Sequence, residues 1–478
     1  MKPFGHGSGD RTYAVLGALL LLGAITARFV VLPGIQGPET LPWPNISLWE
    51  GDRILILAPH PDDESLNCGA IIQKALRMGL SVHIACLTYG DFNQWSFLVY
   101  RYRTRPVVTP GEIRRMGLIR HDEAVAAAGV LGLSSQNLTF LGYPDHGTLD
   151  IFTSHWGDRP AYQSPLTQED RVPYSNALRP GAPYKGEEVL KDLTTVIRDF
   201  RPTKVFVSHP GDHHPDHRAL YLFTTVALWN LRSELAPEVY PYLTHYPSWP
   251  KPTGYHPSKL LEPPNLYREQ IAWQAPRVTT QELRLKKEAL KKHRTQWQSF
   301  DANLRSFLRG NELFGDFPLI SLDPFSNLSL EPNTTGKFAS PSAQLNSQEK
   351  AAFVGIQWRS MRSEGGYLNL SITLSRPIGK AVEAYTYFLG YRSDTPFENM
   401  PKLYVKFGDV DHAVYDQNRA LPKGSLEVSR QTKELSIRIP LQLLGNPERL
   451  LIGAKTNFGF IPLDWTSWRI VDLSPTGS

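Results

Sequence analysis

Short apolar runs alternate with segments of helical periodicity from residue 53 onward. The runs at 53–58, 81–88, 137–142 and 204–208 predict strands, and the periodic segments at 65–78, 112–131, 187–200, 216–231 and 280–308 predict helices. Strands that alternate with helices are typical of βαβ units, in which the strands run parallel. We therefore expect an α/β fold built on a mostly parallel sheet, over residues 51–317.

The C-terminal third has a different pattern. Ser, Asn and Pro are frequent at 318–348, which indicates a linker, and alternating strand-like runs follow at 367–374, 403–407 and 434–439. This alternation predicts an all-β sandwich domain over 349–478. Its tryptophans, Trp358, Trp465 and Trp468, could belong to the core or form a platform that binds carbohydrate.

The N-terminus carries an apolar stretch of about one bilayer width, at 13–32, interrupted by Arg28. Lys2 and Arg11 precede it, and a Pro- and Gly-rich stretch follows. We expect residues 1–35 to be a signal anchor that forms a transmembrane helix, with 36–50 as a linker; a cleaved signal peptide is the alternative. A single-pass membrane protein with an extracytoplasmic catalytic domain is therefore expected.

The amino-acid composition excludes several classes of protein. Of 478 residues, 41% are hydrophobic and 20% are charged, which excludes a disordered chain and a many-pass membrane protein. The net charge of +5 is too small to indicate nucleic-acid binding. Only Cys68 and Cys86 are present, both in apolar segments, so a disulfide scaffold is excluded.

Two polar clusters each follow a predicted strand. The first is His60-Pro61-Asp62-Asp63-Glu64, and the second is the His-rich stretch at 209–217, which holds four histidines. The carboxyl ends of parallel strands lie at one edge of a sheet, where ligands bind. Imidazole and carboxylate groups suit zinc, which in hydrolases takes three protein ligands and keeps one position for water. The two clusters therefore predict one metal site.

These residues resemble the PIG-L/LmbE-type metal-dependent de-N-acetylases, which include the GlcNAc-phosphatidylinositol de-N-acetylase. The similarity is carried by Ala58-Pro59-His60-Pro61-Asp62-Asp63-Glu64, by His214-Pro215-Asp216-His217, by Leu141-Gly142-Tyr143-Pro144-Asp145, and by the stretch Arg309-Gly310-Asn311-Glu312-Leu313-Phe314. The resemblance implies a Rossmann-like, LmbE-like domain.

The resemblance also implies roles for single residues. His60, Asp63 and His217 would bind one zinc ion per chain, although another divalent metal is possible. Asp62 would be the general base, and His214, oriented by Asp216, would stabilise the oxyanion or protonate the leaving amine. Arg120 and Asp145 match positions that contact the sugar.

Two long insertions, at 92–110 and 152–186, follow strand ends and are either substrate walls or loops packed on themselves. The first interleaves aromatic residues with arginines, a combination that suits a sugar carrying a phosphate or carboxylate.

The leading hypothesis is a zinc-dependent N-deacetylase that acts on an N-acetylglucosamine-containing glycoconjugate, lipid-linked or polymeric. A related zinc amidase that acts on a larger N-acyl or thiol-sugar conjugate is one alternative. An inactive glycan-binding surface protein is the other, and the presence of Asp62 and all three ligands argues against it.

Overall fold

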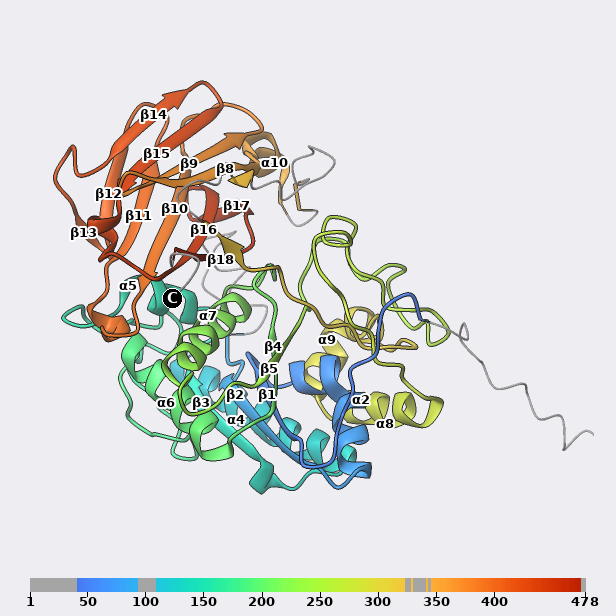
Figure 1. Ribbon diagram of the computed structural model, residues 1–478. Coiled ribbons are helices and arrows are strands. Elements are labelled where there is room, and N and C mark those ends of the chain that lie inside the picture. Colours follow the sequence, from blue (N-terminus) through green and yellow to red (C-terminus); the bar gives the residue numbers. More distant parts are fainter. Residues whose placement is uncertain (1–40, 93–108, 323–327, 330–340, 343–344, 474–478) are drawn as a thin grey trace, which may run out of the picture. The chain divides into compact units, whose positions relative to one another are not determined.

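The computed structural model describes residues 41–92, 109–322, 328–329, 341–342 and 345–473. Its first half is built on a five-stranded sheet in the order β3-β2-β1-β4-β5, and every pair of neighbouring strands is parallel (Figure 1). The strands are β1 (Arg53–Ala58), β2 (Ser81–Thr88), β3 (Leu138–Tyr143), β4 (Lys204–Ser208) and β5 (Glu238–Tyr242). The expected α/β fold with a parallel sheet is thus confirmed.

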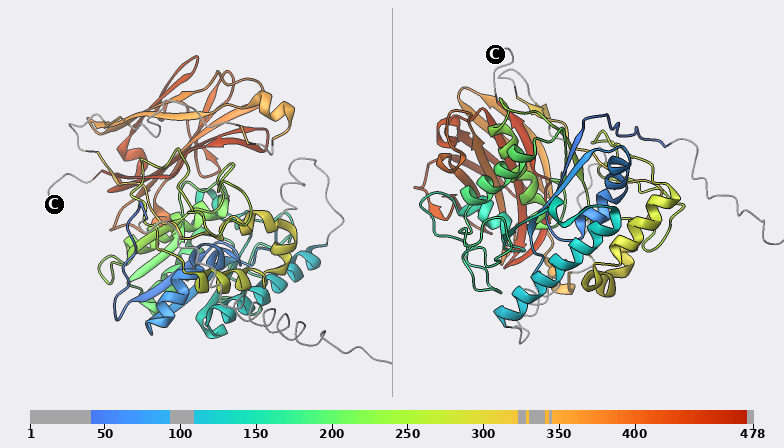
Figure 2. Two further views of the ribbon diagram at one scale, coloured as in Figure 1. Left: turned by 90° about the vertical axis from the view of Figure 1, so that its right-hand side faces the viewer. Right: turned by 90° about the horizontal axis from the view of Figure 1, so that it is seen from below.

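Helices cover this sheet in two groups that follow from its strand order. The chain moves outward from β1 to β2 and β3, then returns to β4 and moves the other way to β5. Right-handed crossovers place the helices of these two movements on opposite faces. One group holds α2 (Asp63–Arg77), α4 (Pro110–Leu131) and α8 (Thr280–Leu290), and the other holds α5 (Thr148–Ser154), α6 (Gly186–Phe200) and α7 (Pro215–Asn230) (Figure 2).

Several elements differ from the sequence prediction; besides the additional helix α5, they include β5 and the helix at 280–308. Strand β5 was not expected, because Pro241 interrupts its short pattern; proline is tolerated there since β5 is an edge strand. The single helix expected at 280–308 is two helices, α8 and α9 (Arg294–Arg305). The chain breaks where the buried His293 turns inward, and its Nε2 lies 3.2 Å from Oε1 of Glu64.

The stretch at 309–314 ties the helices to the sheet. The Glu312 carboxylate accepts hydrogen bonds from the backbone N–H groups of Ala70 and Ile71 in α2, at 2.8 and 3.1 Å. It also pairs with Lys286 of α8 at 2.7 Å, and both side chains are buried. The stretch at 309–314 therefore has a structural role, because it holds α2 and α8 together.

The second half is rich in β-structure. The larger sheet has eight strands, and its main members are β12 (His412–Asp416), β11 (Lys402–Phe407), β10 (Val382–Tyr391), β16 (Arg449–Phe458), β17 (Ile461–Trp465) and β18 (Arg469–Asp472); β13 (Arg419–Ala420) and β6 (Ile320–Ser321) lie at its ends. The smaller sheet contains β14 (Glu427–Gln431), β15 (Glu434–Pro440), β9 (Tyr367–Leu374), β8 (Ile356–Glu364) and β7 (Leu328–Ser329), and the short helix α10 (Ser347–Ala352) precedes β8. Both sheets contribute to one hydrophobic core.

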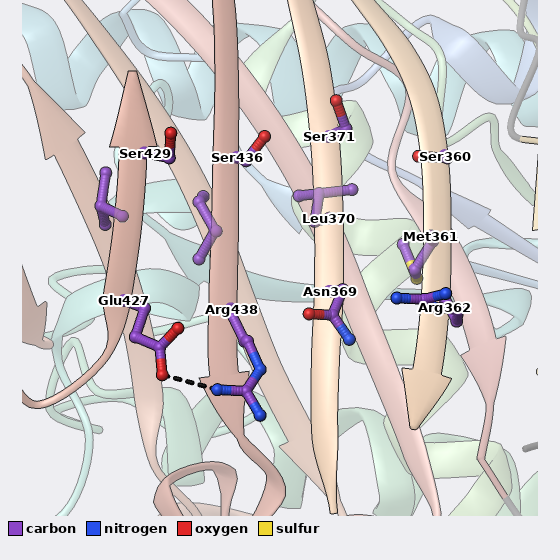
Figure 3. A pocket seen from close by; sticks show the side chains of 12 residues that line it. Ser360, Met361, Arg362, Asn369, Leu370, Ser371, Glu427, Ser429, Ser436 and Arg438 are labelled. Carbon is purple, nitrogen blue, oxygen red and sulfur yellow. Dashed lines mark hydrogen bonds and ion pairs between the residues drawn. The ribbon is translucent and has the colours of Figure 1, made fainter. Parts of the chain in front are cut away.

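The smaller sheet carries a cavity of about 650 Å³. Figure 3 shows its serine, asparagine and arginine side chains, including the ion pair between Glu427 and Arg438. The residues that line this cavity include no aromatic side chain.

Residues of the β-rich half also belong to the core of the α/β half. Leu389, Tyr391, Phe397, Leu451 and Trp468 join the same apolar cluster as the central strands. Trp358 and Trp468 are buried, whereas Trp465 is only partly buried. Two of the three tryptophans are therefore core residues.

Two sequence predictions concern residues that lie wholly or largely outside the described part of the chain. The expected membrane anchor at 1–35 is outside it, and so is most of the insertion at 92–110. In the ranges that the structure describes, no helix is long and apolar enough to cross a membrane. The second insertion is described, and Val172, Tyr174 and Tyr184 pack into the main core.

Candidate active site

The ends of four strands bring histidines and carboxylates to one edge of the parallel sheet. His60 follows β1, Asp145 and His146 follow β3, the stretch at 209–217 follows β4, and His245 follows β5. The strands β1 and β4 are neighbours at the centre of the sheet, and the strands that follow them are added on opposite sides, β2 beside β1 and β5 beside β4. This is the position where open α/β sheets bind ligands.

The three expected metal ligands lie together. Oδ2 of Asp63 is 3.4 Å from Nδ1 of His60 and 3.2 Å from Nε2 of His217. All three side chains are buried. Neither ring nitrogen of His217 makes a hydrogen bond of acceptable geometry, which is unusual for a buried imidazole. Unsatisfied ring nitrogens beside a shared carboxylate fit a bound cation, and this donor set suits zinc.

The charges of this group depend on one another. Burial favours the neutral imidazole of His217, but the carboxylates of Asp212 and Asp63 outweigh it and raise the pKa of His217 to about 9. Burial alone would raise the pKa of Asp63, but His217 and His60 outweigh this effect and hold that pKa well below the usual range. Without a metal, protons on the imidazoles therefore balance the carboxylates, and a bound cation would replace them.

Asp62 stands at the start of α2 with a φ of 134°, a backbone conformation that residues other than glycine rarely adopt. Its carboxylate lies 3.4 Å from Nη2 of Arg120. Burial raises the pKa of Asp62 to about 6; Arg120 opposes this rise and the Asp63 carboxylate adds to it. A carboxylate of this pKa can exchange a proton near neutral pH.

Arg120 and Asp145 are both buried against the chain. Arg120 donates hydrogen bonds to the carbonyl oxygens of Gly90 and Pro61, at 2.7 and 2.8 Å. Asp145 Oδ1 lies 3.2 Å from Nε2 of His60, and its Oδ2 accepts a hydrogen bond from the Phe92 N–H at 2.9 Å. Both residues therefore lie at the site and hold its loops.

His214 is held by its own helix. It is the N-cap of α7, and its Nδ1 accepts a hydrogen bond from the Asp216 N–H at 3.3 Å, so its ring proton lies on Nε2. That nitrogen is 2.9 Å from Nε2 of His146. The Asp216 carboxylate is 3.9 Å from Nδ1 of His214, and it instead accepts hydrogen bonds from the backbone N–H groups of His146 and Thr148. Its Oδ2 also lies 3.2 Å from Nε2 of His60. Asp216 thus orients His214 through its backbone N–H.

Asp212, His245 and His146 join the site although the sequence did not single out a role for them there. Oδ2 of Asp212 is 3.2 Å from Nδ1 of His217, and it accepts hydrogen bonds from the N–H groups of Thr244 and His245, both at 2.9 Å. Nδ1 of His245 lies 3.4 Å from Asp212 Oδ1. For His245, the only signal in the sequence is its place directly after a strand, and the sequence does not predict that strand, β5.

The other two histidines of the stretch at 209–217 turn away from the site. His209 is fully buried among Tyr267, Trp273 and Phe317, and burial lowers its pKa to about 3. His213 packs against Tyr246 and Trp465. Among the described residues, three groups could hold a metal: His60 with His214 and His217; His60 with Asp145, His214 and Asp216; and Asp212 with His217 and His245. Asp63 contacts two of these histidines but belongs to none of the three groups.

An α/β sheet with such a cluster at its switch point defines a candidate metal-binding enzyme. Residues 55–228 match the family PIG-L, GlcNAc-PI de-N-acetylase, and this part of the chain is a PIG-L family domain. Zinc dependence is typical of that family.

Several curated relatives carry one name, 1D-myo-inositol 2-acetamido-2-deoxy-alpha-D-glucopyranoside deacetylase. The one from Mycobacterium sp. (strain KMS) is 28% identical over 178 residues, which cover 37% of this chain and 50% of the relative. The one from Streptomyces scabiei is 27% identical, over 35% of this chain and 45% of the relative. The chain thus spans about half the length of the curated relatives it matches.

Solved structures show weaker similarity. The N,N'-diacetylchitobiose deacetylase from Pyrococcus horikoshii has a TM-score of 0.34 and 20% identity, over 65% of this chain and 94% of that chain. A deacetylase from the biosynthesis pathway of teicoplanin has a TM-score of 0.35 and 16% identity, over 55% of this chain and 96% of that chain.

Proposed function

We propose that the protein is a zinc-dependent hydrolase that removes an N-acetyl group from an N-acetylglucosamine-containing glycoconjugate. The observation that carries this proposal is the meeting of His60, Asp63 and His217 beside Asp62 and His214 in a PIG-L family domain. The names of the relatives, which describe deacetylation of an acetamido sugar linked to inositol, support the substrate class.

His60, Asp63 and His217 would hold the metal, one ion per chain. Bound there, zinc supplies Lewis-acid polarisation and lowers the pKa of a water molecule that it coordinates. The buried carboxylate of Asp212 lies 3.2 Å from Nδ1 of His217 and would hold a proton there, which would leave Nε2 for the metal.

Asp62 would accept the proton of the attacking water and later return it to the leaving amine. Its position supports this role, because it neighbours the proposed ligand Asp63 while its own carboxylate lies 3.4 Å from Nη2 of Arg120. Arg120 is buried and donates hydrogen bonds to two carbonyl oxygens. We therefore assign Arg120 to the positioning of Asp62 rather than to direct contact with the sugar.

His214 would stabilise the oxyanion. Its Nδ1 is engaged by the Asp216 N–H, so Nε2 carries the hydrogen that can be donated to a negatively charged oxygen. Burial and the neighbouring rings of His146 and His60 keep the pKa of His214 well below its usual value, so it is neutral before reaction. Asp145 would face the sugar beside His60.

The location of the protein is part of the same proposal. We place the hydrolase domain at 51–317 and the β-rich domain at 349–478, behind an anchor at 1–35. The stretch at 318–348, expected to be a linker, also supplies β6 and β7 to the two sheets of the β-rich half. The apolar stretch near the N-terminus supports a single-pass membrane protein with its catalytic domain outside the cytoplasm.

Release of acetate from a panel of N-acetylglucosaminyl lipids, oligosaccharides and free sugars tests the activity. We expect zinc-loaded protein to release acetate from at least one class and to lose this activity on chelation. Release of a longer acyl group in preference to acetate would contradict the proposal.

A further inference from the structure

The face of the larger β-sheet that points away from the smaller sheet carries a row of tyrosines, and part of this face packs against the α/β half. On β10, Ala384 and Phe388 point into the core between the two sheets, so Tyr385 and Tyr387 point to the opposite face. Tyr387 pairs across strands with Tyr404 of β11, and Tyr404 pairs with Tyr415 of β12. We call Tyr385, Tyr387, Tyr404 and Tyr415 the tyrosine face.

These rings are partly exposed and close to one another. The ring centroids are 5.5 Å apart between Tyr387 and Tyr404, and 4.8 Å apart between Tyr404 and Tyr415. Within the described part of the chain, the hydroxyl groups of these three residues have no hydrogen-bond partner. Tyr387 also packs against the core of the α/β half, so Tyr404 and Tyr415 offer most of the accessible ring surface and phenol groups.

The tyrosine face continues to the candidate active site. Lys455 of β16 pairs with Tyr385 on one side and with Trp465 of β17 on the other. The Trp465 ring lies over the guanidinium of Arg218, 3.8 Å from it, and 5.8 Å from the ring of His213. Arg218 and His213 directly adjoin His217 and His214 in the sequence, so the face ends at the loop that carries the site.

Trp468 makes a second link between the face and this loop. Its backbone N–H donates to the carbonyl oxygen of Pro210 at 3.1 Å, and its ring lies 5.8 Å from that of Tyr387. Trp468 packs here because Gly453, opposite Tyr387, has no side chain; a Cβ there would lie 2.8 Å from the indole. The two connections fix the face relative to His214 and His217.

The chemistry of this face favours a glycan. A pyranose ring has an apolar face of C–H groups and a rim of hydroxyls, which matches the apolar ring and polar tip of tyrosine. An acyl chain would need a continuous apolar surface, whereas here Lys406 and Lys455 alternate with the rings. The cavity on the smaller sheet lacks aromatic rings altogether (Figure 3).

We propose that the tyrosine face binds the glycan chain attached to the N-acetylated sugar that enters the active site. This inference rests on the proposed function, and it makes the substrate an oligosaccharide or polysaccharide rather than a free monosaccharide. Rigid aromatic side chains lose little conformational entropy on binding, which suits such a surface.

The test is binding of an N-acetylglucosamine hexasaccharide to the full-length chain, measured by calorimetry in the Asp62→Asn background to prevent turnover. Tyr404→Ala should raise the Kd about tenfold, the loss typical of truncating an aromatic residue central to an interface. The matched control is Tyr367→Ala, since Tyr367 lies on the smaller sheet against Arg438 and should leave the Kd unchanged.

Tyr404→Phe keeps the ring stack and should fold even if the alanine variant does not; it should weaken binding by a smaller factor through loss of the hydroxyl. In active protein, Tyr404→Ala should lower the ratio of kcat/KM for the hexasaccharide to that for the monosaccharide. Equal Kd values for Tyr404→Phe, Tyr404→Ala and the parent would overturn the inference. Weaker binding without any acetate release from the parent would refute the proposed function but support the tyrosine face.

Discussion

Asp62 combines three features that seldom occur together in one residue. Its φ of 134° is strained, its side chain is largely buried, and its carboxylate lies between the charges of Arg120 and Asp63. Strain of this kind persists only where the surrounding structure holds it, and it is concentrated at functional sites. The hydrogen bond from the Asp62 N–H to Glu64, which pairs with His293, is part of that support.

Replacement of Asp62 by asparagine separates metal binding from chemistry. Because Asp62 is assigned to the water and not to the metal, Asp62→Asn should retain zinc while kcat falls about 100-fold or more, as expected when a general base is lost. Zinc content and acetate release measured on the same preparation check this. Turnover close to that of the parent would exclude Asp62 as the base.

Loss of a proposed metal ligand should lower zinc binding and activity together, unlike Asp62→Asn, which should lower activity alone. His217→Ala and His60→Ala should each lower the zinc content well below one ion per chain and lower activity with it. His412→Ala, which changes an exposed histidine on β12, is the control and should keep its zinc. If both ligand variants remain fully loaded, the metal lies elsewhere.

The sequence could predict that His60, Asp63 and His217 lie together, because each cluster directly follows a recognisable strand. It could not identify His146, His245 or the contact of Asp212 with His217, since these depend on how separate strand ends meet. It also could not show that His209 and His213 turn away, because spacing in a loop does not determine the direction of a side chain.

At the scale of elements, Asp212 joins the loop after β4 to the end of β5. Its carboxylate accepts hydrogen bonds from the N–H groups of His214, Thr244 and His245. It is fully buried, and the histidines at 217 and 245 keep its pKa well below the usual range. One side chain therefore joins two strand ends and contacts His217, a proposed metal ligand.

Asp212→Ala should leave several buried N–H groups without an acceptor and cost about 2 kcal/mol or more of folding free energy. It should also weaken zinc binding roughly 10- to 100-fold, as loss of a carboxylate behind a ligating histidine usually does. Asp212→Asn keeps one acceptor oxygen and should lose less of both. Thermal unfolding and zinc titration measure the two effects, and an unchanged zinc affinity in Asp212→Ala would contradict the assigned role.

The strands β1 to β4 and their helices were predictable because hydrophobic periodicity is strong there. The edge strand β5 and the break between α8 and α9 were not, because tertiary contacts decide both. The contact of His293 with Glu64 lies in the turn between the two helices, and Glu123 accepts hydrogen bonds from the Thr295 N–H at the start of α9.

At the scale of the whole molecule, the two halves share a core. Residues 42–478 form one compact unit, and Trp156 of the α/β half meets Phe397 and Gln417 of the β-rich half. A binding module joined by a linker would be removable, whereas here its removal would expose apolar surface. The sequence pattern shows the change of secondary structure but not this contact.

Truncation at about residue 318 should therefore give a protein that aggregates or unfolds at a clearly lower temperature than the full chain. Solubility and thermal unfolding of the truncated and full chains check this. A soluble truncated protein with full activity on a short substrate would show that the shared core contributes little.

Deletion of residues 1–40 should release the protein from membranes while sparing activity, because the compact unit begins only at residue 42. Fractionation of cells that express each form tests this. A full-length protein that salt alone removes from membranes would contradict the anchor.

The edge of the parallel sheet beyond β5 has one more consequence. Pro241 lacks an N–H, its carbonyl oxygen accepts a hydrogen bond from Gly315, and Phe314 bridges to Tyr242. An open edge strand is a template on which a second chain can add a strand. Here proline and the stretch at 311–316 block that route, so any self-association of the protein must use a surface other than a continuous intermolecular sheet through β5.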